Sequence, residues 1–180
     1  MRFLFINMQK LILPLFWCLF LISFSVKPIK EELKWSNLKE VSIKLKQQQK
    51  PVLIDLYTDW CHWCKVMDKK TYSNQKVIDY LSEKFYAVKV NAETKESLTW
   101  ANKTFTYNNS YSINDFALYA TKGETGFPTT VILTNVNAEP IPISGFLEPR
   151  ELEPILKYFG EGAYLTQTFL QYKKTFKATW

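Results

Sequence analysis

The spacing of hydrophobic and polar positions along the chain predicts a series of short helices and strands. Apolar residues three or four apart are typical of a helix that covers a core, and a nearly continuous apolar run is typical of a buried strand. Asn37, followed three residues later by Glu40, has the spacing of a capping box at the start of a helix. The first half of the chain is predicted to form a helix at 38–48, a strand at 52–58, a helix that ends near 70, a helix at 74–84 and a strand at 85–91.

The pattern is weaker over residues 92–126, which are polar and aromatic. The one clear element there is a short helix near 114–121, which Gly123 is expected to end. The second half is predicted to continue with a strand at 129–134, a weak strand at 140–146, a helix at 149–159 and a terminal helix at 163–176. Pro140 and Pro142 favour an edge position in the sheet for the weak strand in which they lie.

The order of these elements predicts an α/β fold in which helices cover both faces of a central mixed sheet. The chain has 180 residues, enough for one domain with a core and too few for two. Hydrophobic residues make up 47% of the chain and aromatic residues 16%, so we expect a packed domain and not a disordered chain. The terminal helix is expected to carry one apolar stripe, formed by Leu165, Phe169, Tyr172 and Phe176.

The N-terminal residues have the pattern of a secretory signal peptide. Arg2 and Lys10 precede an uncharged apolar run at 11–26, and the small residues at 23–25 have the arrangement that signal peptidase reads. The run is shorter than the roughly 20 residues of a spanning helix, although an uncleaved membrane anchor is the alternative. The sequence therefore predicts an exported protein, periplasmic or secreted, with a signal peptide at 1–25 and one domain at 26–180.

The distribution of charge argues against a nucleic-acid partner. The formal net charge of the whole chain is +6, and it falls to +4 when Arg2 and Lys10 leave with the signal peptide. The remaining lysines are scattered along the sequence and form no basic cluster of the kind that binds nucleic acid. We therefore expect no nucleic-acid partner.

Once Cys18 is lost with the signal peptide, Cys61 and Cys64 are the remaining cysteines. A bridge across two residues closes too small a loop to stabilise the fold much. A structural zinc ion needs four Cys or His ligands, and the single histidine, His62, lies between the two cysteines. A haem site would need a histidine where Lys65 stands, and an iron–sulfur cluster would need ligands from another chain. We therefore expect no metal and no cofactor.

The remaining interpretation of the cysteine pair is a dithiol that cycles between thiol and disulfide. Cys61 falls where the predicted strand gives way to a helix, so that unpaired N–H groups and the positive helix end would stabilise its thiolate. Cys64, one turn further along, would resolve the mixed disulfide that forms when Cys61 attacks a substrate. Asp55 is a carboxylate within an apolar strand, where burial would raise its pKa. From the residues alone, Asp55 is either functional or a hydrogen-bonded structural acid at a strand end.

The stretch VLIDLYTDWCHWCK resembles the thioredoxin superfamily, in which a buried aspartate stands six residues before the first motif cysteine, as Asp55 stands before Cys61. This resemblance implies that Asp55 accepts a proton from Cys64, through water, during resolution. The stretch AVKVNAE is similar to the next strand of that family, which implies that Lys89 neighbours the buried aspartate. The implied architecture is a thioredoxin fold with an insertion before the cis-proline loop and an extra C-terminal helix.

The stretch GFPTT resembles the family's loop with a cis-proline that faces the disulfide. The resemblance implies a cis bond before Pro128 and a Phe127 backbone that is free to pair with an extended substrate segment. The resemblance covers about residues 35–159. Within the superfamily, this part of the sequence is similar to exported thioredoxin-like proteins and to the C-terminal domain of the bacterial thiol:disulfide interchange reductase. The chain departs from plain thioredoxin between the two cysteines and by the insertion at 94–126, which is either a partner surface or a decorated loop.

The resemblance to the interchange reductase implies a protein-disulfide reductase that receives electrons from a membrane partner. Its expected substrates are protein or peptide disulfides, for which Trp60 and Trp63 would form a flat apolar rim. A charged His62 would favour the Cys61 thiolate and hence an oxidant, unless His62 simply faces solvent. The alternatives are a protein-disulfide oxidase or isomerase, a thiol partner in cytochrome assembly, and a non-catalytic binding module in which the cysteines form a passive bridge.

Overall fold

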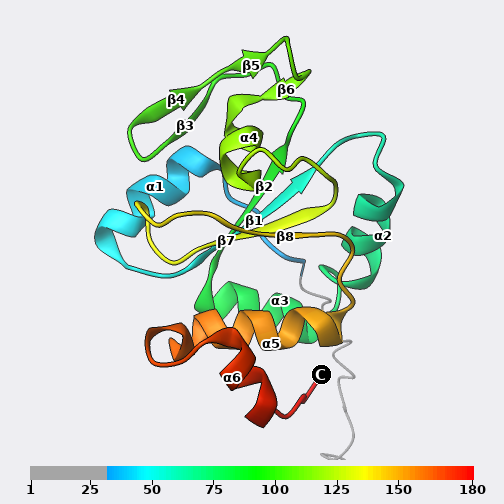
Figure 1. The fold of residues 1–180 in the computed structure, drawn as a ribbon, viewed down its shortest axis with the longest axis vertical. Helices are drawn as coiled ribbons and strands as arrows, with labels where there is room; N and C mark the ends of the chain where they lie inside the picture. The colour runs from blue at the N-terminus through cyan, green and yellow to red at the C-terminus, as the bar shows by residue number, and fades with distance from the viewer. Residues whose placement is uncertain (1–31) are drawn as a thin grey trace, which may run out of the picture.

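The computed structural model describes residues 32–180, so the predicted signal peptide at 1–25 lies outside the described residues. A four-stranded sheet lies between two layers of helices (Figure 1). Its strands are β1 (Val52–Tyr57), β2 (Tyr86–Asn91), β7 (Thr129–Leu133) and β8 (Ile141–Ser144). The strand order is β2-β1-β7-β8, in which β1 and β2 are parallel and the other two pairings are antiparallel. The predicted α/β fold with a mixed sheet is confirmed, and β8 lies at the predicted edge.

Helices cover both faces of the sheet, so the core has two halves. One half lies under α1 (Leu38–Gln47) and α4 (Asp115–Thr121), and the other under α2 (His62–Lys70), α3 (Gln75–Lys84) and α5 (Pro149–Gly160). Successive side chains of β1 alternate between them, with Ile54 in the first half and Leu53 in the second. Burial on both faces explains why β1 is an almost unbroken apolar run. Within 32–180, none of the helices is long and apolar enough to cross a bilayer.

Side-chain caps fix where several helices begin. Asn37 Oδ1 accepts the N–H of Glu40 at 2.8 Å, which is the first bond of the predicted capping box. The Glu40 carboxylate pairs with Lys44 at 2.5 Å, so this ion pair takes the place of the reciprocal capping bond. Asn74 and Asn114 cap α3 and α4 through their side-chain oxygens.

Two small hairpins occupy the segment in which the sequence predicts only a helix. They are formed by β3 (Leu98–Trp100) with β4 (Lys103–Phe105) and by β5 (Tyr107–Asn108) with β6 (Ile113–Asn114). Ala101 and Asn102, in the turn between β3 and β4, have φ angles of 50° and 63°, a conformation that glycine usually supplies, so the ordinary hairpin signal is missing. Trp100 is 1% exposed and anchors the first hairpin in the core half under α1.

The C-terminal segment differs from the prediction of one helix over 163–176. The chain forms a short 3-10 turn, η1 (Ala163–Leu165), and then a separate helix, α6 (Phe169–Thr175). The break has a local cause, because Thr168 and Gln171 form a capping box that starts a new helix. The predicted extra C-terminal helix is therefore present, but it begins at Phe169, six residues later than the apolar spacing indicated, and ends at Thr175, one residue earlier.

The predicted apolar stripe of that helix is only partly formed. Leu165 is 74% exposed and lies outside it. Phe169 and Tyr172 pack on Tyr158 of α5, with ring centroids 5.3 Å apart in both pairs, and Phe176 packs on Tyr172. The stripe therefore begins at Phe169, where the helix itself begins.

Residues after α6 return to α5 and are held there by a buried carboxylate. Glu153 of α5 is fully buried, and its Oε1 accepts the N–H of Thr179 at 2.8 Å and the hydroxyl of the same residue at 2.7 Å. Its carboxylate also accepts the N–H of Trp180 at 3.2 Å and a bond from Lys157 Nζ at 2.8 Å. These partners compensate the burial of the charge and attach the tail to the helix.

Replacing Glu153 by alanine is expected to lower the free energy of unfolding by about 3 kcal/mol, because Lys157 loses its partner and the tail loses its anchor. Urea denaturation measures this loss. Glu83→Ala is the matched control, since Glu83 pairs with Lys84 at an exposed site, and its loss should change stability by less than about 0.5 kcal/mol. Equal effects of the two substitutions would contradict a stabilising role for the buried carboxylate.

Candidate redox-active site

The two cysteines lie where the loop after β1 enters α2. Cys61 is the N-cap of that helix and Cys64 lies in its first turn. Their sulfurs form a disulfide with an S–S distance of 2.11 Å and Cα atoms 5.3 Å apart. The N–H of Cys64 donates to Cys61 Sγ at 3.0 Å, so the positive end of the helix faces this sulfur. After reduction, the same end of the helix would stabilise a negative charge on Cys61.

Asp55 lies in the middle of β1 and is 2% exposed. Its register partner on the parallel strand β2 is Lys89, whose Nζ donates to Asp55 Oδ2 at 2.8 Å. Burial raises the pKa of Asp55 to about 6, and the positive charge of Lys89 offsets only part of that effect. A carboxyl group with this pKa exchanges its proton close to neutral pH, which is the property that a proton acceptor needs.

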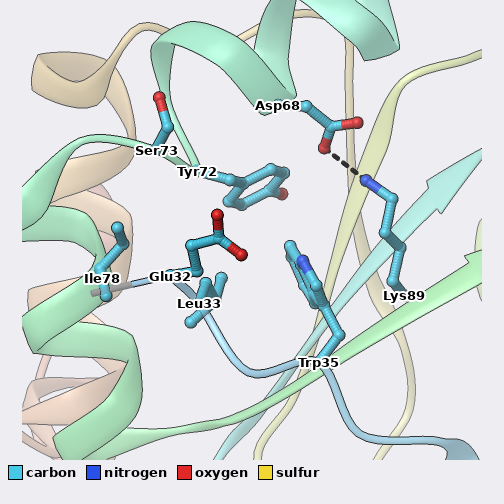
Figure 2. Close-up of a pocket in the computed structure, with 8 residues that line it drawn as sticks. All are labelled: Glu32, Leu33, Trp35, Asp68, Tyr72, Ser73, Ile78 and Lys89. Atoms are coloured by element: carbon cyan, nitrogen blue, oxygen red, sulfur yellow. Dashed lines mark hydrogen bonds and ion pairs between the residues drawn. The ribbon is translucent and has the colours of Figure 1, made fainter. Parts of the chain in front are cut away.

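Lys89 also donates a hydrogen bond to Asp68 of α2, a residue that the sequence analysis does not single out (Figure 2). Burial lowers the pKa of Lys89, but Asp55 and Asp68 outweigh that effect and raise it overall. The ammonium group lies 5.2 Å from the centroid of the Trp35 ring. Lys89 is therefore held as a charged group between two carboxylates.

A pocket of about 390 Å³ opens beside this ion pair, and its walls include the rings of Trp35 and Tyr72 (Figure 2). The side chain of Asp68 is 41% exposed, that of Lys89 is 20% exposed and that of Asp55 is 3% exposed. Burial therefore increases along the row from Asp68 through Lys89 to Asp55. Solvent reaches this group of charges from the side of Asp68.

The loop before β7 contains a cis peptide bond between Phe127 and Pro128. The carbonyl of Pro128 accepts the N–H of Gly145 at 2.8 Å, and Thr129 Oγ1 donates to the carbonyl of Gly126 at 2.7 Å. In the described part of the chain, the backbone N–H and C=O of Phe127 form no hydrogen bond. These two groups are available to pair with another polypeptide segment.

Two pairs of aromatic side chains connect the cysteine turn to neighbouring loops. Trp60 is 69% exposed, donates from Nε1 to Glu93 Oε1 at 2.8 Å, and lies edge-on to Phe127 with ring centroids 6.4 Å apart. Trp63 is 56% exposed and lies 5.6 Å from the ring of Phe146. Glu93 and Phe146 are additions to the residues that the sequence singled out.

The residues predicted for the site fall into two groups. The first, with Trp60, Trp63, Phe127 and Pro128, shares one surface with the cysteine turn. The second is the buried pair of Asp55 and Lys89 within the sheet. His62 is exposed in the first turn of α2, with its ring 5.7 Å from that of Trp63. Among residues 32–180, no three Cys, His, Asp or Glu side chains are grouped as metal ligands.

A family model described as "Protein of unknown function, DUF255" (Thioredox_DsbH) matches residues 20–174. Spermatogenesis-associated protein 20 of Homo sapiens is 27% identical over 108 residues, which make up 60% of this chain and 12% of that protein. The thiol:disulfide interchange protein DsbD of Yersinia pestis (strain Pestoides F) is 49% identical over 43 residues, or 23% of this chain and 7% of DsbD. The chain therefore matches about a tenth of the length of these curated relatives.

A solved structure described as "DsbH Oxidoreductase" superposes on this fold with a TM-score of 0.53 and 20% sequence identity, covering 75% of this chain and 90% of that one. Together with the family match, this similarity confirms the thioredoxin fold that the sequence predicts. A cysteine pair at disulfide distance on such a fold supports thiol–disulfide chemistry in general.

Proposed function

Because the chain belongs to the family described as "Protein of unknown function, DUF255" (Thioredox_DsbH), we propose that it is an exported thiol:disulfide oxidoreductase that reduces protein or peptide disulfides. The observation that carries the proposal is the Cys61–Cys64 disulfide at the N-terminus of α2, where the helix faces Cys61 Sγ. This geometry suits a dithiol in which the first sulfur attacks and the second resolves. Export is part of the proposal and rests on the N-terminal sequence pattern.

The proposed reaction has two steps. The Cys61 thiolate attacks one sulfur of a substrate disulfide, forms a mixed disulfide and releases the other substrate sulfur as a thiolate. Cys64 gives its proton to Asp55 through water and attacks Cys61 Sγ, which forms the Cys61–Cys64 disulfide and releases the second substrate thiol. Two electrons pass from the protein to the substrate. A dithiol donor, which we propose to be a membrane partner, then reduces the Cys61–Cys64 disulfide.

The neighbouring residues have roles that fit their positions. The Phe127 backbone, beside Pro128, would pair with an extended substrate segment as an added strand. Trp60 and Trp63 would form the apolar rim on which that segment lies. Lys89 would keep Asp55 ionised between turnovers, since it is the only cation that bonds this carboxylate among the described residues.

The reduction potential of the Cys61–Cys64 disulfide tests both the activity and its direction. We expect a value between about −270 and −200 mV, the range of thioredoxin and glutaredoxins, because the apolar Trp63 precedes Cys64 and adds no charge that would favour the reduced state. The chain is equilibrated in thiol–disulfide buffers of known potential, and its free thiols are counted by alkylation and mass spectrometry.

The double variant Cys61→Ser/Cys64→Ser corrects this measurement for background alkylation. A potential near −120 mV, that of a strong oxidant, would assign the protein to the oxidase alternative. If no buffer reduced the disulfide in the folded chain, the result would favour the alternative of a non-catalytic binding module in which the cysteines form a passive bridge.

A further inference from the structure

An apolar groove lies next to the disulfide. It has a volume of about 330 Å³ and is lined by Trp63, Phe127, Pro128, Gly145 and Phe146. Because Trp63 stands between the two cysteines in the sequence, the groove adjoins the turn that carries the disulfide. The rings of Trp63 and Phe146, 5.6 Å apart and tilted by 36°, form one wall. Trp63 nevertheless keeps 56% of its surface exposed, which leaves a large apolar area open to a ligand.

The proposed reaction determines what covers this groove. For Cys61 to attack a disulfide, the polypeptide that carries this disulfide must lie across the cysteine turn and beside Phe127. The residues that flank the substrate cysteine then lie next to Trp63 and Phe146. A volume of about 330 Å³ is at the small end of the range for ligand pockets, which suits a bulky side chain better than a separate cofactor.

Apart from the backbone N–H and C=O of Phe127, which are proposed to pair with the substrate backbone, the polar groups next to the groove already have partners. The N–H of Gly145 donates to the carbonyl of Pro128 at 2.8 Å. Lys70, whose Nζ lies 6.0 Å from the centroid of the Phe146 ring, is paired with Glu148 at 3.6 Å. A polar or charged substrate side chain would therefore leave water without gaining a partner of its own, whereas an apolar one would gain contact with two aromatic rings.

We propose that this groove binds a bulky apolar side chain next to the disulfide-bonded cysteine of the substrate, so that the protein prefers disulfides in apolar sequence surroundings. This preference rests on the proposed function and specifies the substrate class of the same site. Phe146 is its specificity-determining residue, because it closes the groove from the loop after β8 and lies outside the cysteine motif. The side-chain contact supplements the pairing of the substrate backbone with Phe127.

Three synthetic peptides test the preference. Each is a dimer joined by a disulfide between its single cysteines, and the peptides differ only in the two residues that flank the cysteine: leucine, serine or aspartate. One reduced chain and one peptide dimer give one oxidised chain and two peptide thiols, so a single-turnover rate constant reports substrate recognition and attack. We expect the leucine peptide to react at least about tenfold faster than the serine and aspartate peptides, because a binding pocket distinguishes side chains of this size difference by that much.

Two variants locate the preference. In Phe146→Ala, the ratio of the leucine to the serine rate constant should fall to about one. Tyr111→Ala is the matched control, since Tyr111 is another exposed aromatic residue (66% exposed) that does not line the groove, and it should keep the wild-type ratio.

Equal rate constants for the three peptides, or the fastest reaction with the aspartate peptide, would overturn the preference and leave the reductase intact. A leucine preference that survives in Phe146→Ala would overturn the assignment to this groove. If none of the peptides were reduced, the proposed function itself would fail, and the substrate class with it. The failures of the two proposals are therefore distinguishable in one set of reactions.

Discussion

Replacing Cys61 by serine is expected to lower the rate of insulin reduction at least about a thousandfold, because a serine hydroxyl is not ionised at neutral pH and cannot form the mixed disulfide. Replacing Cys64 by serine removes only the resolving sulfur. In that variant Cys61 still attacks at the N-terminus of α2, so the mixed disulfide with the substrate should accumulate. Insulin turbidity in dithiothreitol measures turnover, and mass spectrometry of the alkylated protein measures the trapped adduct.

These two variants serve as controls for each other, since they differ only in which sulfur of one disulfide is lost. Both lose the disulfide, so a purely structural role for the bridge would affect them in the same way. The proposed mechanism requires them to differ, with a covalent adduct on Cys61 in Cys64→Ser and none on Cys64 in Cys61→Ser. Equal adduct formation, or none in either variant, would argue for the passive bridge of the binding-module alternative.

The sheet was predictable from sequence because its strands carry their own signal. β1 is buried on both faces and therefore reads as an apolar run, and Pro142 marks β8 as an edge strand. The β3–β4 hairpin escaped prediction because Ala101 and Asn102 adopt its turn without glycine. Its stability comes from the burial of Trp100 against a distant helix, which local spacing does not reveal.

The same distinction applies to the site. The positions of Cys61, Cys64 and Asp55 could be predicted because all three belong to one continuous strand–turn–helix segment. Asp68 could have been added by the same reasoning, since it follows Cys64 by four residues and so lies on the same side of α2. Phe146 could not, because it reaches Trp63 from a loop far along the chain, and only tertiary packing brings the two together.

Replacing Asp55 by asparagine is expected to raise the free energy of unfolding of the oxidised protein by about 3 kcal/mol at pH 8 and by almost nothing near pH 3.5. The pKa of Asp55 is about 6 in the folded chain and 3.8 for an unperturbed aspartate. Each pKa unit corresponds to about 1.4 kcal/mol. The measurement is urea denaturation of both proteins across this pH range.

The sign of the effect follows from proton binding. Because the folded pKa is the higher one, the folded state binds more protons than the unfolded state between about pH 4 and pH 6. The wild type therefore loses stability as the pH rises through this window, and the loss is complete above pH 6. Asparagine carries no charge at any of these pH values and avoids the loss. Lys89 keeps Asp68 as its partner in the variant, so no cation is left unpaired.

Asp79→Asn is the matched control, since Asp79 is exposed on α3 and bonds only Gln75 among the described residues, and it should change stability by less than about 0.5 kcal/mol at every pH. A gain in the free energy of unfolding of Asp55→Asn that did not depend on pH would show that burial does not destabilise the charged form of Asp55. The same variant should resolve mixed disulfides more slowly, because Cys64 loses its proton acceptor. A residue whose removal stabilises the fold and slows the reaction is retained for its chemistry. If Asp55 had a purely structural role, the same substitution would instead lower the free energy of unfolding of the protein.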